Sequence, residues 1–146
     1  MNVQSILSVK GTEVATIEPE ASLADAAAVL RDRGFGALVV SGDGSSIDGI
    51  VSERDIVRAL AAHGESTLGR SVSSCMSGNV LTCTTSDTID RLMEMMTERR
   101  IRHLPVRRDD GMIGGMVSIG DVVKFRLQEL ERENVQLHDY IQGNVQ

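Results

Sequence analysis

The stretch GIVSERD at residues 49–55 recurs as GMVSIGD at residues 115–121, an offset of 66 residues along the chain. Each copy joins an apolar run to a Ser and, three residues after the Ser, to an Asp. This pattern is typical of a strand that runs directly into a helix N-cap. The same offset aligns residues 5–58 with 71–124 without a gap, and 14 aligned positions are identical. Because a solenoid needs at least three repeats, two copies predict a pair of matched halves.

Each half is expected to contain a strand, a helix, two further strands and a second helix. The first helix begins after Ser22 in one copy and after Thr88 in the other, and its apolar residues recur at i, i+3, i+4 and i+7. These residues are Leu23, Ala26, Ala27 and Leu30, and then Ile89, Leu92, Met93 and Met96. The predicted strands are residues 14–17, 37–40 and 48–51, and then 80–83, 104–106 and 114–117. Strands mixed with helices in this order indicate an α/β (α+β) fold.

The last helix of the second copy continues well beyond its counterpart. Its stripe runs at alternating spacings of four and three residues through Val123, Leu127, Leu130, Asn134, Leu137 and Ile141. This spacing is typical of a coiled-coil seam, in which one buried Asn fixes the register. A dimer contact and packing on the chain's own domain are equally compatible with it. The predicted division is a first domain at 1–63, a linker at 64–71, a second domain at 72–126 and a helical extension at 127–146.

Composition limits the classes of partner. The net charge of −6 opposes non-specific attraction to nucleic acid or anionic membranes. No apolar run approaches the roughly 18 residues of a membrane span, and the first residues lack the features of a signal peptide. We therefore expect a cytoplasmic protein that binds neither DNA nor membranes. The two Cys and three His match no metal-site spacing, and Cys83 is expected to be a small buried side chain.

The repeated Ser and Asp support two interpretations. Ser at an N-cap with an acid three residues later forms a capping box, which is common and purely structural. Alternatively, the free N–H groups and partial positive charge of a helix N-terminus suit an anion such as phosphate. An Asp one turn inside the helix could accept hydrogen bonds from a vicinal diol, as an acid does with ribose in dinucleotide sites. Five Arg within residues 99–108 are either phosphate partners or a solvated face.

The repeat, its two G-h-h-S-x-x-D segments and the phrases FGALVV and IRHLPV resemble a tandem pair of CBS (cystathionine-β-synthase) domains, of the bacterial stand-alone type. The resemblance covers about residues 5–125. It implies a Bateman module, in which two β-α-β-β-α repeats pack about a pseudo-twofold axis and leave two clefts. Such modules are regulatory sensors that bind AMP, ADP, ATP and in some cases NAD or S-adenosylmethionine, and they usually form homodimers.

The resemblance also implies roles for particular residues. Asp55 and Asp121 would hold ribose hydroxyls, and Ser52 and Ser118 would lie beside the ribose or phosphate. Backbone groups of Thr16, Ile17 and Thr82 would contact adenine. Ala37 and His103, which occupy matched positions, would each line one cleft. Arg54, Arg102 and His103 would contact phosphate. Pro105 predicts a strand at a sheet edge or cleft. The second copy has Ile119 and Gly120 in place of Glu53 and Arg54, so the two clefts should differ.

Two other classes of function compete with a nucleotide sensor. An enzyme would need a nucleophile paired with a base, or a metal cluster, and duplicated sites favour binding symmetry over a catalytic constellation. A pure interaction module would have empty clefts and a C-terminal helix that docks a partner or a second copy. The sensor hypothesis requires a ligand with different affinities for two arrangements of the halves, which would relay binding to an unidentified regulated protein.

Overall fold

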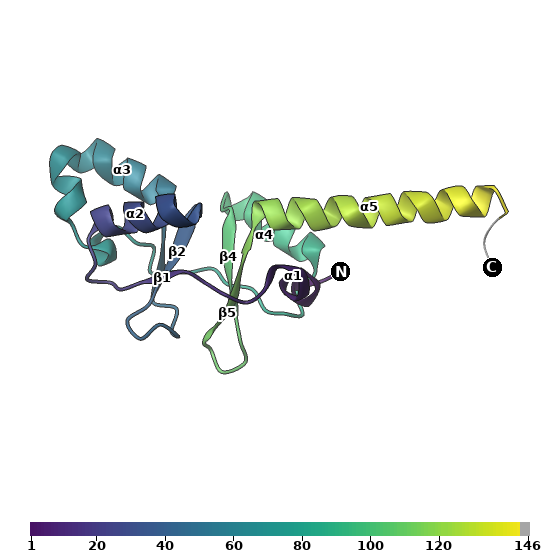
Figure 1. Cartoon of the computed structure of the whole chain (residues 1–146), viewed down its shortest axis with the longest axis horizontal. Helices are drawn as coiled ribbons and strands as arrows, with labels where there is room; N and C mark the ends of the chain where they lie inside the picture. The colour runs from purple at the N-terminus through teal and green to yellow at the C-terminus, as the bar shows by residue number, and fades with distance from the viewer. Residues whose placement is uncertain (144–146) are drawn as a thin grey trace.

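Residues 1–143 are described in a computed structural model, in which two small sheets lie side by side with helices packed against them (Figure 1). The α-helices are α1 (Val3–Lys10), α2 (Leu23–Arg33), α3 (Glu53–His63), α4 (Ile89–Arg99) and α5 (Ile119–Ile141). Two 3-10 helices, η1 (Gly64–Gly69) and η2 (Val72–Ser74), join the halves. The strands are β1 (Thr16–Ile17), β2 (Ala37–Val40), β3 (Gly49–Ser52), β4 (His103–Arg107) and β5 (Ile113–Ser118). The predicted α/β fold of two repeats is therefore confirmed.

The two sheets follow the same plan with one difference. In the first sheet the order is β1-β2-β3, with β2 parallel to β1 and antiparallel to β3. In the second sheet β4 pairs antiparallel with β5 only. The matched pairs keep the same register, since Ala37 lies opposite Ser52 and His103 opposite Ser118.

The predicted strand at 80–83 is wrong, because only Cys83 forms a single parallel bridge to Val106. In the first half, the N–H of Val39 donates to the carbonyl of Ala15 at 3.2 Å and extends the pairing. Pro105 stands at the position that corresponds to Val39, and proline has no N–H to donate. Pro105 therefore ends the pairing before Leu81, and within residues 1–143 the Leu81 carbonyl has no hydrogen-bond partner.

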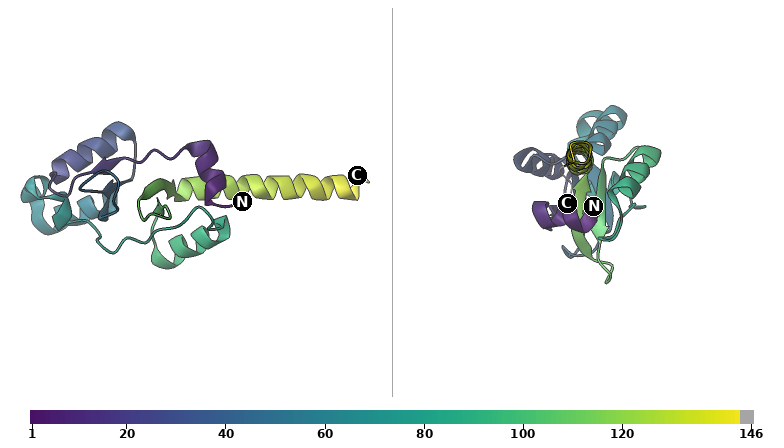
Figure 2. Two further views of the ribbon diagram at one scale, coloured as in Figure 1. Left: turned by 90° about the horizontal axis from the view of Figure 1, so that it is seen from below. Right: turned by 90° about the vertical axis from the view of Figure 1, so that its right-hand side faces the viewer.

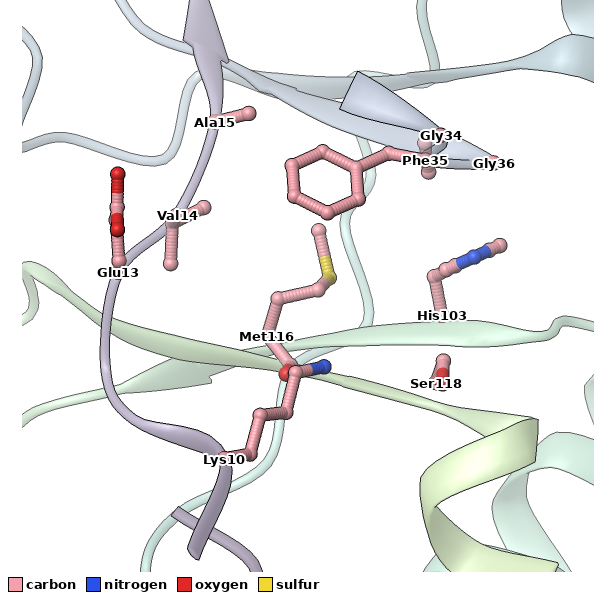
Figure 3. Close-up of a pocket in the computed structure, with 11 residues that line it drawn as sticks. Lys10, Glu13, Val14, Ala15, Gly34, Phe35, Gly36, His103, Met116 and Ser118 are labelled. Carbon is pink, nitrogen blue, oxygen red and sulfur yellow. The ribbon is translucent and has the colours of Figure 1, made fainter.

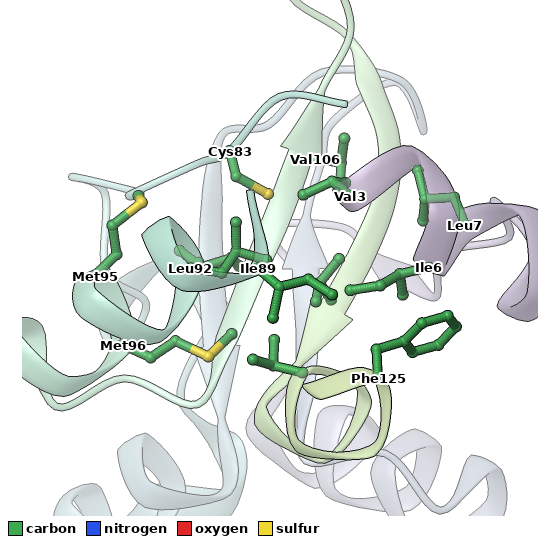
Figure 4. Packing of buried hydrophobic residues seen from close by; sticks show 13 residues of the cluster. Val3, Ile6, Leu7, Cys83, Ile89, Leu92, Met95, Met96, Val106 and Phe125 are labelled. Atoms are coloured by element: carbon green, nitrogen blue, oxygen red, sulfur yellow. The ribbon is translucent and has the colours of Figure 1, made fainter. Parts of the chain in front are cut away.

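The segments that precede the two repeats are exchanged between the two cores. Helix α1 buries Val3, Ile6 and Leu7 among the side chains of the second half, beside β5 and the start of α5 (Figure 4). In return Val72, which corresponds to Ile6, is fully buried in the first core. The N-cap of α1 is Asn2, whose side chain accepts from the N–H of Ser5. No pattern in the sequence had predicted α1, and its apolar face ties the start of the chain to the second repeat.

The helix stripes are confirmed with one correction on α4. Its buried residues are Ile89, Leu92, Met95 and Met96, whereas Met93 is 39% exposed. Met93 and Met95 flank the stripe on opposite sides, and the buried face of α4 is rotated toward Met95. The N-caps Ser22 and Thr88 are as predicted, with each side-chain oxygen accepting from a backbone N–H three residues later.

The long helix α5 leaves the body of the molecule and projects beyond it (Figures 1 and 2). Its first turns pack on the second core through Val122 and Phe125, which are buried. The predicted stripe points elsewhere and is exposed along its whole apolar length at Val123, Leu127, Leu130, Leu137 and Ile141. The last three residues of the predicted extension lie outside the described residues. Packing of the stripe on the chain's own domain is therefore excluded for residues 123–141.

Candidate functional site

Two clefts lie between the repeats and are related by the offset of 66 residues. Cleft A is a cavity of about 340 Å³ whose lining includes Val14, Ala15 and Ser118 (Figure 3). Cleft B consists of two adjoining cavities of about 470 and 450 Å³, which share Ile50, Ser77, Arg99, Ile101 and His103. The residues of cleft B that match the named residues of cleft A are Val80, Leu81 and Ser52. Each cleft thus combines the start of one repeat with the strand-to-helix junction of the other.

Each junction carries a complete capping box, as its sequence predicts. In the first copy Asp55 Oδ2 accepts from the N–H of Ser52 at 2.8 Å and from its hydroxyl at 3.0 Å. In the second copy Asp121 Oδ2 accepts from Ser118 at 2.9 and 3.0 Å. Both Asp residues are half-buried. The structural role therefore uses one carboxylate oxygen, and within residues 1–143 Oδ1 of Asp55 has no hydrogen-bond partner.

The helix N-termini offer fewer free N–H groups than the sequence suggests. The N–H of Glu53 donates to the carbonyl of Gly36 at 3.0 Å, and the N–H of Asp55 donates to the Ser52 hydroxyl at 3.3 Å. The second copy repeats both bonds, with Ile119 donating to Arg102 at 2.8 Å. An anion at either helix would therefore need side-chain cations in addition to the backbone.

Cleft A has its carboxylate already paired. Lys10, the last residue of α1, donates from Nζ to Asp121 Oδ2 at 2.5 Å and to the carbonyl of Met116 at 2.7 Å. Burial alone would raise the pKa of Asp121, but the bonds from Lys10 and Ser118 outweigh it and hold that pKa below its ordinary value. The carboxylate of Asp121 is thus ionised at neutral pH and held by a cation of the chain itself.

Cleft B is basic and has an unpaired carboxylate. Its lining includes one acid, Asp55, together with Arg54, Arg58, Arg99, Arg100 and Arg102. Arg54 reaches across the cleft, donating from its guanidinium to the carbonyl of Arg100 at 3.3 Å. The sequence comparison predicted that the clefts differ, and the structure shows that the difference is mainly one of charge.

His103 lies where the two clefts meet and contributes to the lining of both. Its ring packs over Gly36, where an added Cβ would lie 2.9 Å from Cε1, so a larger residue at this position would have to displace the imidazole. Burial, together with the charges of Arg102 and Lys10, lowers the pKa of His103 against the opposite effect of Glu53 and nearby Asp121. A neutral imidazole at pH 7 offers a hydrogen bond but no charge to a phosphate.

Of the residues that the resemblance implied, the structure brings eight to the clefts: Ala37, Ser52, Arg54, Asp55, Arg102, His103, Ser118 and, through Lys10, Asp121. Thr16 lies in β1, Ile17 is buried in the first core, and Pro105 is buried in β4. Thr82 contacts Arg107, and neither Ile119 nor Gly120 is among the residues that line the two clefts.

Some lining residues were missed by the sequence comparison. The residues two positions before Thr16 and Thr82, which are Val14 and Val80, line the clefts instead. Lys10 and Arg58 belong to no sequence motif. The repeat could have indicated Val14 and Val80, because Val occupies this matched position in both copies. Cys83 is buried as predicted, and burial together with the charge of Asp87 raises the pKa of its thiol to about 12.

Comparison with known proteins identifies the class to which this fold and these clefts belong. The model of the CBS domain family matches residues 7–62 and again residues 72–128. The chain belongs to the CBS domain family and contains a tandem pair of these domains, a Bateman module.

Two relatives illustrate the similarity. The chain is 41% identical over 123 residues to the CBS domain-containing protein CBSX3, mitochondrial, of Arabidopsis thaliana, with 82% of this chain covered. The aligned part spans 59% of the length of that relative. The crystal structure of the CBS-domain protein ATU1752 from Agrobacterium tumefaciens is 44% identical and superposes with a TM-score of 0.82, over 86% of this chain and 92% of that one.

Two more distant structures share the fold and contain ligands. The CBS domain protein PAE2072 from Pyrobaculum aerophilum, complexed with AMP, is 24% identical with a TM-score of 0.72, over 83% of this chain and 89% of that one. The CBS pair of MJ0100, in complex with 5'-methylthioadenosine and S-adenosyl-L-methionine, is 23% identical with a TM-score of 0.76, over 86% and 98%. Within residues 1–143, no helix is long and apolar enough to cross a membrane.

Proposed function

We propose that this chain is a non-catalytic regulatory module that senses an adenosyl ligand, such as AMP, ADP, ATP or NAD, in the clefts between its repeats. The observation that carries the proposal is the Ser–Asp pair at the edge of each cleft, with Oδ1 of Asp55 left without a partner. The binding of AMP by one relative of the same fold, and of S-adenosylmethionine by another, supports the same ligand class. Cytoplasmic location stays a prediction, and the Arabidopsis relative is described as mitochondrial.

Cleft B offers a complementary group for each part of an adenine nucleoside. Oδ1 of Asp55 would accept from a ribose hydroxyl while Oδ2 keeps the capping box intact. The Leu81 carbonyl, left unpaired by Pro105, would accept from the exocyclic amine of adenine. Ile50 and Ile101 provide the apolar surface for the ring. All four residues already line the cavities of cleft B.

Ligand binding would act on the relative position of the halves. Each cleft is lined by both repeats, so a ligand contacts both at once. A ligand with higher affinity for one arrangement would shift the population toward it, by no more than the difference between its two affinities. The helices that begin at the two junctions, α3 and α5, would carry this change to a regulated protein.

We also propose that a second copy of the chain covers the exposed stripe of α5 in a parallel coiled coil. In a parallel pair Asn134 faces Asn134 of the second copy, and the two amides can satisfy each other. In the antiparallel pairing of the stripe, Asn134 would instead face Leu130 of the second copy and leave a buried amide unpaired. Val122 and Phe125, which face the body, lie about 100° and about 160° around the helix from the stripe, so the body does not occupy the same side.

The charges beside the stripe also favour the parallel arrangement. There, Arg126 would face Glu131 of the second copy, and Glu133 would face His138. The antiparallel arrangement would instead place Glu131 against Glu131 and Glu133 against Glu133. The contact of Arg126 with Asp90 of its own chain, at 3.9 Å, is at the long limit of an ion pair.

Sedimentation of Leu130→Glu tests the coiled coil, with Val135→Glu as the matched control. Both side chains are exposed on α5, at 45% and 55%, but only Leu130 lies in the stripe. We expect the parent and Val135→Glu to be dimers and Leu130→Glu to be a monomer at micromolar concentrations. A monomeric parent, or equal dissociation of both variants, would contradict the coiled coil.

Calorimetric titration tests the sensor proposal. The parent protein is titrated with AMP, ADP, ATP, NAD and S-adenosylmethionine, and then Asp55→Ala and Asp121→Ala are titrated with whichever ligand binds. Asp55→Ala should lose more affinity than Asp121→Ala, because Asp121 is already paired with Lys10. Absence of binding by all five ligands at millimolar concentration would overturn the proposed function.

A further inference from the structure

The five arginines that line cleft B carry a positive charge that the one acid of its lining, Asp55, offsets only in part. They are Arg54, Arg58, Arg99, Arg100 and Arg102. Within residues 1–143 none of them forms a salt bridge, although Arg31, Arg33, Arg91, Arg108 and Arg126 each do. The chain as a whole carries a net charge of −6, so acidic partners are abundant elsewhere. Guanidinium groups without an acidic partner on both sides of one cavity are a site for an anion with several charges.

The backbone at Arg100 supplies a second, independent observation. Arg100 ends α4 in the left-handed conformation with φ of 53°, and it is the only non-glycine residue of the described chain with positive φ. At the corresponding end of α2 the residue is Gly34, with φ of 66°. Glycine adopts this conformation without strain, whereas a residue with a Cβ does not. The second repeat therefore tolerates backbone strain at Arg100, which is one of the five arginines that line cleft B.

The matched positions around cleft A lack this set of charges. Gly34, Gly36 and Gly120 stand where cleft B has Arg100, Arg102 and Arg54. The two other matched positions, which correspond to Arg99 and Arg58, keep a cation as Arg33 and Lys124. Arg33 lies 3.6 Å from Glu13, which lines cleft A. The two copies share the Ser–Asp pair but differ in these arginines. The two clefts therefore differ in charge, while both keep the carboxylate proposed to bind ribose.

We infer that cleft B selects adenine nucleotides with two or more phosphates, such as ADP and ATP, over AMP and S-adenosylmethionine. The inference rests on the proposed function. With the ribose at Asp55, the phosphate chain lies between the arginines of α3 and those at and beyond the end of α4. A single phosphate satisfies only part of this set, and the sulfonium of S-adenosylmethionine adds a positive charge to it.

The decisive variant is Arg100→Gly, which restores the residue of the matched position. We expect it to weaken ADP and ATP binding about 10- to 100-fold, as loss of one charge-assisted contact would, while AMP changes much less. We also expect the unliganded variant to melt at the same or a higher temperature, because the left-handed strain is removed. Loss of affinity without loss of stability is a result that a merely structural arginine would not give.

A matched pair of alanine variants provides the control. Arg99→Ala in cleft B should weaken ADP binding, whereas Arg33→Ala, its counterpart beside cleft A, should not. AMP binding as tight as that of ADP and ATP, or unchanged ADP affinity in Arg100→Gly, would overturn the inference while leaving the sensor function intact. Binding of tripolyphosphate as tight as that of ATP would overturn the assignment to a nucleotide. If no adenosyl ligand bound at all, the proposed function itself would fail.

Discussion

Replacing Lys10 by Met removes the bond that holds the carboxylate of cleft A. Lys10 donates to Asp121 at 2.5 Å and to the carbonyl of Met116 at 2.7 Å, and its side chain is 34% exposed. A solvent-exposed ion pair contributes up to about 1 kcal/mol. The second charge-assisted bond adds a similar amount after allowance for solvent. Met keeps the aliphatic stem and is the residue at the matched position, Met76, so we expect a loss of about 1–2 kcal/mol in the free energy of unfolding at pH 7.

The pH dependence of this loss has a defined sign. The folded pKa of Asp121 is below its ordinary value, so its contribution is present above the unfolded pKa of about 3.9 and is lost as the pH falls through the folded pKa. Urea unfolding at neutral and acidic pH, together with an NMR titration of the Asp121 carboxyl, measures both effects. The pKa of Asp121 should rise in Lys10→Met. Lys124→Met changes the other lysine of the chain, which is exposed and should alter stability by less than about 0.5 kcal/mol. Equal stability of Lys10→Met and the parent, with an unshifted Asp121, would refute the account of cleft A.

Two further predictions concern the fold beside the clefts. Ile6→Ala should lower the free energy of unfolding by about 2–5 kcal/mol, because Ile6 is fully buried in the second core. Val9→Ala, on the exposed face of α1, should change the stability in urea little. Equal effects of the two substitutions would contradict the packing of α1 on the second core. Pro105→Val should restore the N–H that Val39 has, giving a slowly exchanging amide in hydrogen-exchange measurements and weaker adenine binding at Leu81; a rapidly exchanging amide there would contradict the explanation of the missing strand.

Much of the fold follows from local patterns. The Ser–Asp capping boxes and the N-caps Ser22 and Thr88 are satisfied by bonds within three residues, so the sequence alone could place them. The missing strand at 80–83 was also accessible in principle, because the loss of the N–H at Pro105 is written in the sequence. Predicting the loss of this strand required knowledge of the carbonyl group to which that N–H would have donated a hydrogen bond.

The parts that were missed depend on contacts across the chain. Helix α1 is short, and the core on which its apolar stripe packs is formed by residues 80 or more positions later. The stripe therefore cannot be interpreted until that core is known. Lys10 meets Asp121 only because α1 crosses to the second half. The arginine-rich stretch of cleft B was visible in the sequence. Whether its arginines pair with acids or line a cavity depends on contacts that only the structure shows.

A crystal structure of the protein grown with ADP tests the central claim most directly. We predict ribose hydroxyls within hydrogen-bond distance of Asp55 Oδ1, adenine against Ile50 and Ile101, and the two phosphates among the arginines of cleft B. An ADP molecule bound outside both clefts, or in a cleft with its ribose away from the Ser–Asp pair, would contradict it.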